Sequence, residues 1–232
     1  MKYPPIIQRI YNHFVKKSAI LPKIGLSKLI PEDTWVQMHQ SGSADGNVSM
    51  PELMSINRAI GFHKPINLFE IGTFNGRTTL NMAANCSKKS KVYTLDLPKE
   101  QLNSTNLPIA PGEKAFIDKE VIGSNYLGTV YEKKIIQLYG DSATFDFSRF
   151  NNKINFIFID GSHSYEYVLN DSKKALSLLK NGKGAIMWHD YGGWIGVTKA
   201  LNELYLKDER FKDLKHIHGT SLAYLFIDSK LK

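Results

Sequence analysis

The fold is decided by the stretch Asn67-Leu-Phe-Glu-Ile-Gly-Thr-Phe-Asn-Gly-Arg-Thr-Thr79. An apolar, β-prone run ends at an acid, and two glycines with three residues between them lead into a helix-forming segment. This order predicts a buried parallel strand that turns tightly into a helix over about 77–85. Gly72 is expected to turn the backbone with a positive φ, and Gly76 to let it pass close to a ligand.

The loop between these glycines leaves several ligands open. A phosphate-binding loop needs four residues between its glycines and then a lysine, whereas this loop has three and then Arg77. The dinucleotide fingerprint G-x-G-x-x-G is absent, because Phe74 stands at its second glycine. Glu70 would repel a pyrophosphate, so a ligand with amino or hydroxyl donors fits better. A tight turn that binds nothing is the structural alternative.

The 232 residues can form one well-cored α/β domain with an extension. Residues 1–60 are expected to be an N-terminal helical extension, and residues 61–232 the main domain. Cys86 is the single cysteine, which excludes an internal disulfide and fits a reducing compartment. No apolar run approaches the ~20 residues of a membrane span, and Pro4-Pro5 interrupts the apolar core of a signal peptide. These features predict a cytoplasmic protein.

The net charge of +8 is the strongest compositional signal. Residues 1–40 hold six Lys/Arg against Glu32 and Asp33, a net of +4. Such an arm can hold phosphates or lie on an anionic membrane face. A solvated helix face gives the same pattern. Aromatic residues do not interleave with the basic ones, so nucleic acid is not the expected partner.

Apolar strands and helical segments alternate along the chain, as a doubly wound sheet requires. Residues 97–133 are polar and dotted with Pro and Gly, so they predict a lid, a substrate wall or an oligomer arm over the carboxyl edge of the sheet. The last two strands are expected to form an antiparallel hairpin at the sheet edge. Strands are predicted at 67–71, 91–96, 134–139, 154–160, 184–190, 214–218 and 222–227, and helices at 5–17, 51–62, 77–85, 165–180 and 196–206.

Acids stand at or just after the ends of five predicted strands: Glu70, Asp96, Asp141, Asp160 and Asp190. In an open parallel sheet the ligand lies along this edge, and five such acids are hard to explain by helix capping alone. Asp96 is placed to bind ribose hydroxyls. Asp141, followed by Ser142, is placed to accept a hydrogen bond from an adenine amino group.

Four motifs carry a resemblance to a known family. They are Phe69–Thr79, Leu138-Tyr-Gly-Asp-Ser142, Phe158-Ile-Asp-Gly-Ser-His-Ser-Tyr-Glu166 and His189-Asp-Tyr191. Together they resemble the class I S-adenosylmethionine-dependent methyltransferases of the methyltransferase 24 family, over about residues 46–227. Its members include metal-dependent sugar O-methyltransferases of macrolide biosynthesis and cephalosporin-hydroxylase-type proteins. The resemblance implies a Rossmann-like, mostly parallel sheet with S-adenosylmethionine as cofactor, its methionine end at Glu70 and Gly72.

The same resemblance implies the catalytic roles. Asp160 would bind a divalent metal, His163 would be the general base, and His189-Asp190 would complete the metal site. Mg²⁺ is the expected metal, although His189 in place of a second carboxylate shifts the preference toward softer ions. The metal would lower the pKa of an acceptor hydroxyl, and His163, with an ordinary pKa of ~6.5, would take its proton. The expected acceptor is a small, polar molecule such as a sugar or glycoside.

Two other functions stay open. One is an RNA methyltransferase that uses the basic residues 1–40, and the other is a cofactor-binding scaffold without catalysis. The first is disfavoured because no Asn/Asp-Pro-Pro-Tyr/Phe run follows the strand at 154–160. The second is disfavoured because cofactor binding alone does not need Asp160 and His163. Assembly into a homo-oligomer is a further expectation.

Overall fold

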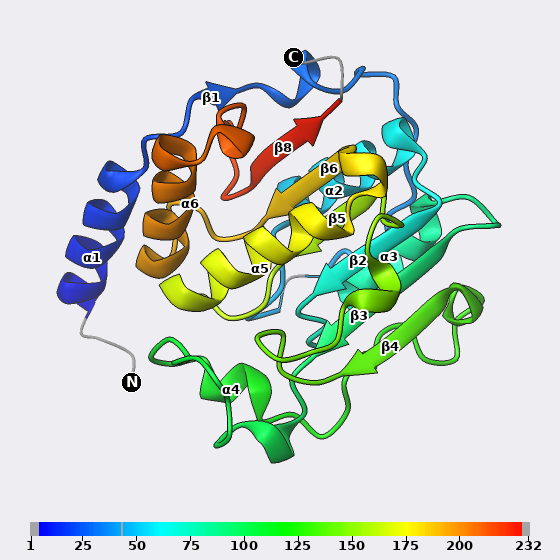
Figure 1. Cartoon of the computed structure of the whole chain (residues 1–232), viewed down its shortest axis with the longest axis horizontal. Helices are drawn as coiled ribbons and strands as arrows, with labels where there is room; N and C mark the ends of the chain where they lie inside the picture. Colours follow the sequence, from blue (N-terminus) through cyan, green and yellow to red (C-terminus); the bar gives the residue numbers. More distant parts are fainter. Residues whose placement is uncertain (1–4, 43, 229–232) are drawn as a thin grey trace.

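The computed structural model describes residues 5–42 and 44–228, which form a twisted sheet of eight strands with helices on both faces (Figure 1). The strand order is β1-β7-β8-β6-β5-β2-β3-β4. The five strands from β6 to β4 run parallel, and β8 is antiparallel to both β6 and β7. The strands are β1 Lys23–Ile24, β2 Asn67–Ile71, β3 Lys91–Asp96, β4 Ile135–Tyr139, β5 Phe156–Ile159, β6 Gly184–Trp188, β7 Lys215–Ile217 and β8 Ala223–Ile227.

Helices cover the sheet in two layers. In Figure 1, α5 and α6 lie over the face toward the viewer, and α2 and α3 lie behind it. Short 3-10 turns follow Gly25, Pro98, Tyr131, Phe147, Leu179 and Asp208. The α-helices are α1 Pro5–Ser18, α2 Met50–His63, α3 Arg77–Asn85, α4 Lys114–Ile117, α5 Tyr165–Leu178 and α6 Ile195–Lys207.

The central strands are apolar on both faces because both faces are covered. In β2, Phe69 packs into the core under α5 and α6, while its neighbour Leu68 packs into the core under α2 and α3. Phe69 also meets the rings of Tyr93, Phe147 and Phe150, with centroids 5.0–6.4 Å apart. These two apolar layers hold the carboxyl ends of the parallel strands in one line.

The predicted α/β architecture is confirmed, and the helix expected at 77–85 is α3. The antiparallel pairing of the last two strands is also confirmed. Their position is different, because β8 lies between β6 and β7 and the edge is formed by β1, which the sequence patterns did not predict. A two-residue strand has no alternation to detect, and β1 is recognisable only through its pairing with β7. The boundary expected at residue 60 stays a prediction.

In the described part of the chain, no helix has the length and apolar character needed to cross a bilayer.

The turn after β2 shows why a glycine stands at position 72. Gly72 has φ +97° and donates its N–H to the carbonyl of Leu95 at 2.8 Å. A Cβ at this position would lie 2.0 Å from the carbonyl oxygen of Asp160, which follows β5. The turn therefore depends on glycine both for its dihedral angle and for the close approach of two backbones.

We expect Gly72→Ala to lower the free energy of unfolding by about 3 kcal/mol or more, since it adds backbone strain and a steric overlap that neither strand can relieve. Urea unfolding followed by circular dichroism measures the change. Gly128→Ala is a suitable control, because Gly128 also has a positive φ but a Cβ added there would meet no atom within 4 Å. Equal losses in the two variants would contradict the close-approach argument.

Candidate active site

A cavity of about 330 Å³ opens at the carboxyl edge of the parallel strands. Residues after β2, β3, β4, β5 and β6 line it, together with residues 45–47 and part of the segment 97–133. Of the residues expected at the site, the cavity is lined by Gly72, Asp96, Asp141, Ser142, Asp160, His163, His189 and Asp190.

Glu70 and Gly76, expected at the cofactor, lie elsewhere. Glu70 is fully buried, and its Oε2 accepts hydrogen bonds from the hydroxyls of Thr79 and Thr94. A Cβ on Gly76 would lie 2.6 Å from the ring of Tyr126, so the absence of a side chain at this position makes room for the 97–133 segment. Neither residue is among those lining the cavity, and their cofactor contacts stay predictions.

Burial raises the pKa of Glu70 to about 8, although the hydroxyls of Thr79 and Thr94 oppose the shift. Its Oε1 is buried and has no hydrogen-bond partner among the described residues. A carboxyl with a raised folded-state pKa is neutral in the fold while the unfolded chain ionises near its ordinary value of 4.5. The folded state therefore loses stability as the pH rises between these two values.

We expect Glu70→Gln to remove this loss. Between pH 5 and pH 8, the free energy of unfolding of the unmodified protein should decrease more than that of the variant. The difference should be on the order of a few kcal/mol. Urea unfolding at several pH values measures the difference. The comparison also cancels the contribution of Asp171, whose pKa burial raises to about 7. Parallel pH profiles for the two proteins would show that Glu70 is ionised in the fold.

The two acids expected to bind the adenosine part already have partners in the protein. Asp96 accepts the N–H of Phe74 at 2.7 Å and lies 3.1 Å from Nζ of Lys119. Burial nevertheless raises the pKa of Asp96 above its ordinary value. Because Asp96 is at the end of β3 and lines the cavity, its position agrees with the predicted ribose contact, which stays a prediction.

Asp141 is held in a similar way after β4. It accepts the backbone N–H groups of Asn106 and Ala143 and the hydroxyl of Tyr167, each at 2.8 Å. Burial raises the pKa of Asp141, but these hydrogen bonds outweigh it, so the net shift is downward. Asn106 belongs to the 97–133 segment, as does Lys119. The segment thus contacts two of the predicted cofactor residues.

His163 lies between two carboxylates. Its Nε2 is 2.8 Å from Oδ2 of Asp190, and its Nδ1 is 2.6 Å from Oε1 of Glu113. The imidazole also stacks on Trp194, with ring centroids 4.4 Å apart. Burial lowers the pKa of His163, but hydrogen bonds and charges from Asp190 and Glu113 raise it to about 10. The expected pKa near 6.5 is therefore wrong for this arrangement, in which the imidazole is a cation at neutral pH.

His189 bridges the remaining carboxylates. Its Nδ1 is 3.0 Å from Oδ1 of Asp160 and 3.2 Å from Oδ2 of Asp190, and its Nε2 is 3.2 Å from Oε2 of Glu52. Burial lowers the pKa of His189, but the charges of Asp160 and Asp190 raise it well above the ordinary value. Asp190 itself has a left-handed backbone, with φ +64°. This dihedral is uncommon for a residue other than glycine and marks a constrained position.

These residues fit a divalent cation. Ligand atoms of Asp160, His189 and Asp190 all lie within 4.8 Å of one another. Two carboxylates at this separation need a positive charge between them, and protonated His189 supplies it in the structure. A cation bound by the two carboxylates and neutral His189 would satisfy the same charge requirement. The donor set therefore suits a metal, although metal binding by these three residues stays a prediction.

Two residues of the cluster were not predicted from the sequence. Glu113 comes from the 97–133 segment, where no regular pattern marks it. Glu52 completes a capping box with Ser49 at the start of α2, which the spacing Ser-x-x-Glu indicates. Its carboxylate additionally accepts the N–H and hydroxyl of Ser221, both at 2.7 Å, and faces His189. The spacing Ser-x-x-Glu predicts the capping role of Glu52, whereas no local sequence pattern predicts its contact with His189.

The aromatic residues near the site separate into two groups. Trp194 lines the cavity. Trp188 and Tyr191 are fully buried, with the indole N–H donating to Ser172 and the phenol hydroxyl donating to Asn202. Trp188 and Tyr191 are therefore packing residues, and Trp194 is the aromatic side chain after β6 that a ligand in the cavity can reach.

Solved structures with a similar fold include three methyltransferases. The O-methyltransferase TomG from Streptomyces achromogenes, involved in tomaymycin synthesis and solved with SAM, is 14% identical with a TM-score of 0.55, over 87% of this chain and 94% of that one. An O-methyltransferase from Bacillus cereus, solved with SAH, is 15% identical with a TM-score of 0.53, over 79% and 84%. SAH-bound PaMTH1 from Podospora anserina is 12% identical with a TM-score of 0.54, over 98% of each chain. Identities this low show the common fold alone.

A search of curated protein sequences finds no match. A family model described as a methyltransferase domain, Methyltransf_24, matches residues 69–191 of the 232, which is more than half of the chain. This range includes the turn at Gly72, all the expected cofactor residues, and the cluster of Asp160, His163, His189 and Asp190. The chain therefore belongs to this family of S-adenosylmethionine-dependent methyltransferases.

Proposed function

We propose that the protein transfers a methyl group from S-adenosylmethionine to a hydroxyl of a small, polar acceptor, with a divalent cation and His163 at the reacting hydroxyl. The observation that carries the proposal is the convergence of Asp160, His189 and Asp190 beside His163 in one cavity. A bare cofactor site needs no such cluster. The solved relatives described as O-methyltransferases support a hydroxyl as the acceptor.

S-adenosylmethionine would supply an activated methyl group on its sulfonium centre. Gly72, Asp96, Asp141 and Ser142 line the part of the cavity in which its methionine and adenosine groups would bind. Asp96 would accept hydrogen bonds from the ribose, and Asp141 would accept one from the adenine amino group. Both carboxylates are buried, where a hydrogen bond that is lost without replacement is costly, so each contact would favour a ligand with a matching donor.

Asp160, His189 and Asp190 would hold the cation, which lowers the pKa of the acceptor hydroxyl when bound. The cation would then neutralise the charge that Asp190 presents to Nε2 of His163, 2.8 Å from its Oδ2. Nδ1 of His163 stays on Glu113, so Nε2 is the atom left to take the hydroxyl proton. The indole ring of Trp194 stacks on the imidazole of His163 and would keep it in this orientation.

The acceptor is proposed to be neutral or cationic rather than phosphorylated. Six carboxylates line the cavity, and Lys119, which is paired with Asp96, is the one lysine or arginine among its lining residues. A sugar or glycoside hydroxyl fits this environment, since its polar groups can hydrogen-bond to carboxylates and its apolar face can lie on Trp194. A phosphate would be repelled.

The cofactor assignment is tested first. We expect mass spectrometry of the purified protein to find S-adenosylmethionine or S-adenosylhomocysteine, and calorimetry to show S-adenosylhomocysteine binding that Asp96→Ala weakens by about 1–3 kcal/mol. Asp45→Ala, which removes an exposed carboxylate at the cavity rim, serves as control. Unchanged affinity in Asp96→Ala would place ribose recognition on other residues.

A further inference from the structure

The amino edge of the sheet, opposite the cavity, gathers exposed lysines. Each lies in a segment that leads into one of the five parallel strands. Within residues 64–66, 87–91, 132–134, 151–155 and 179–184, Glu132 is the single acid. The exposed lysines, called the basic edge below, are Lys64, Lys88, Lys89, Lys91, Lys133, Lys153, Lys180 and Lys183.

Hydrogen bonds show that the basic edge is continuous. Lys91 donates through Nζ to the carbonyl of Lys133 at 3.3 Å, and its N–H donates to the carbonyl of Ile66 at 2.9 Å. The side chain of Asn67, the next residue, donates to the carbonyl of Lys153 at 3.0 Å.

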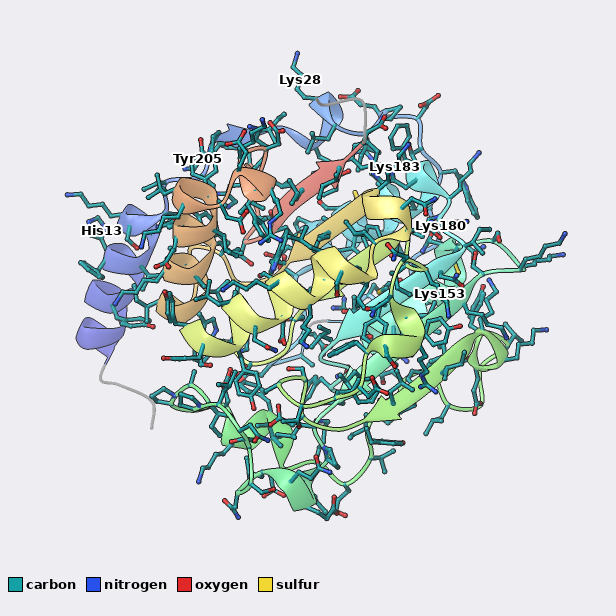
Figure 2. The ribbon with its side chains drawn as sticks, viewed as in Figure 1. His13, Lys28, Lys153, Lys180, Lys183 and Tyr205 are labelled. Atoms are coloured by element: carbon teal, nitrogen blue, oxygen red, sulfur yellow. The ribbon has the colours of Figure 1, made fainter. Side chains whose placement is uncertain are left out.

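The hydrogen bonds continue from Lys153 toward the start of β6. The N–H of Lys180 donates to the carbonyl of Ile154 at 2.8 Å, one residue after Lys153. Figure 2 labels Lys153, Lys180 and Lys183 along the side of the sheet where β5 and β6 begin. The lysines therefore form one row across five neighbouring strands.

The row is not explained by pairing within the protein. Among the described residues, none of these eight lysines forms an ion pair. A different lysine contacts the C-terminal end of α3, where the helix dipole is negative. Buried Lys134 donates there to the carbonyls of Ala83 and Cys86 at 2.8 and 3.1 Å. Lys88 and Lys89 are thus surplus to the needs of this helix. The positive charge of the basic edge is therefore available to a binding partner.

Apolar side chains lie beside these charges. Ile66 is 50% exposed and is adjacent to Lys91 through the backbone hydrogen bond above. Phe62 and Phe226 are 43% and 42% exposed, and both rings flank His63, at 5.0 and 4.7 Å. Phe226 is paired in the sheet with Ala185, which follows Lys183 by two residues. The basic edge therefore has apolar groups within it that can enter a nonpolar layer.

We propose that the basic edge docks on an anionic lipid surface. Lysines near such a surface bind through its negative potential, and half-exposed isoleucine and phenylalanine side chains enter the boundary between headgroups and acyl chains. A nucleic acid would use the lysines but would gain little from Ile66. Since the cavity is at the opposite edge of the sheet, the docked protein would keep its cavity open to water. The proposal is independent of the proposed methyl acceptor.

Vesicle sedimentation of the full chain tests the proposal. We expect binding to vesicles of phosphatidylcholine mixed with phosphatidylglycerol and none to vesicles of phosphatidylcholine alone. The triple variant Lys88→Glu, Lys180→Glu, Lys183→Glu should bind about 100-fold more weakly, from a contribution of roughly fivefold for each lysine. The double variant Ile66→Ser, Phe226→Ser should also bind more weakly, and its residual binding should vanish in high salt.

The matched control is Lys16→Glu, Lys17→Glu, Lys28→Glu, which makes the same change in net charge at exposed residues of the N-terminal part. It should bind the mixed vesicles like the unmodified protein. Each variant is also checked for its S-adenosylhomocysteine affinity, which should be unchanged. Equal losses in the two triple variants, or no binding to mixed vesicles, would overturn the proposal. Tighter binding to single-stranded RNA through the same lysines, unaffected by Ile66→Ser, would overturn it in favour of a nucleic acid.

Discussion

Asp160→Ala should lower methyl transfer by about 1,000-fold or more while changing the affinity for S-adenosylhomocysteine by less than about threefold. The reason is that Asp160 provides one of the two carboxylates that contact Nδ1 of His189, and the proposed cation site needs both. Removing it would leave a site too weak to hold a divalent cation beside the acceptor. Formation of S-adenosylhomocysteine in the presence of candidate glycoside acceptors, followed by mass spectrometry, measures the loss.

A second readout does not depend on knowing the acceptor. Mn²⁺ binding, followed by the loss of its free electron-paramagnetic-resonance signal, should be seen with the unmodified protein and disappear in Asp160→Ala. Asp45→Ala should bind Mn²⁺ normally, because Asp45 lines the same cavity but lies outside the cluster. Chelation should stop turnover, and Mg²⁺ or Mn²⁺ should restore it. Full activity after exhaustive chelation would disprove the role of the cation.

Glu113→Gln should lower kcat by about 100-fold with little change in cofactor affinity, the scale for losing a carboxylate that orients a catalytic histidine. Glu113 is buried and accepts hydrogen bonds from the N–H groups of Ala110 and His163 and from the hydroxyl of Ser162. It thereby joins the 97–133 segment to the loop that carries His163. The substitution keeps the shape of the side chain and removes its charge.

The pH dependence distinguishes this positioning role from a purely structural one. Asp190 and Glu113 both raise the pKa of His163, so the loss of one charge should lower that pKa toward its ordinary value. A base must be neutral to accept a proton, so the rising limb of the pH–rate profile should move to lower pH in Glu113→Gln. Glu120→Gln, in the same segment but exposed and paired with Lys99, should leave rate and profile unchanged. A lower rate with an unmoved profile would contradict the assignment.

Much of the fold could be predicted because its signals are local. Apolar runs that end in Glu70, Asp96 and Asp160 identify parallel strands, and the topology of such sheets brings their carboxyl ends together. The glycine at position 72 has a local signal as well, but its full cause is not local. Its Cβ would overlap the backbone after β5, which follows β2 by more than 80 residues.

The rest of the site could not be predicted because it depends on contacts across the chain. Glu113 lies in a segment without periodicity, and its approach to His163 is decided by how the segment 97–133 packs. The pKa of His163 depends on two carboxylates from distant elements, so its charge could not be inferred from the spacing Asp160-Gly-Ser-His163. The second case follows from the low dielectric constant of a buried site, where each added neighbour changes the balance of charges.

The 97–133 segment also changes what cofactor binding means for this protein. Lys119 occupies the carboxylate of Asp96, and Asn106 occupies that of Asp141. Under the proposed assignment, ribose and adenine meet carboxylates that already contact groups of the protein, so each must share the carboxylate or displace its partner. Displacement would make the measured affinity a difference between two sets of hydrogen bonds, and it would free an ammonium group and an amide of the segment. Cofactor binding would thereby rearrange the part of the cavity wall that the 97–133 segment forms.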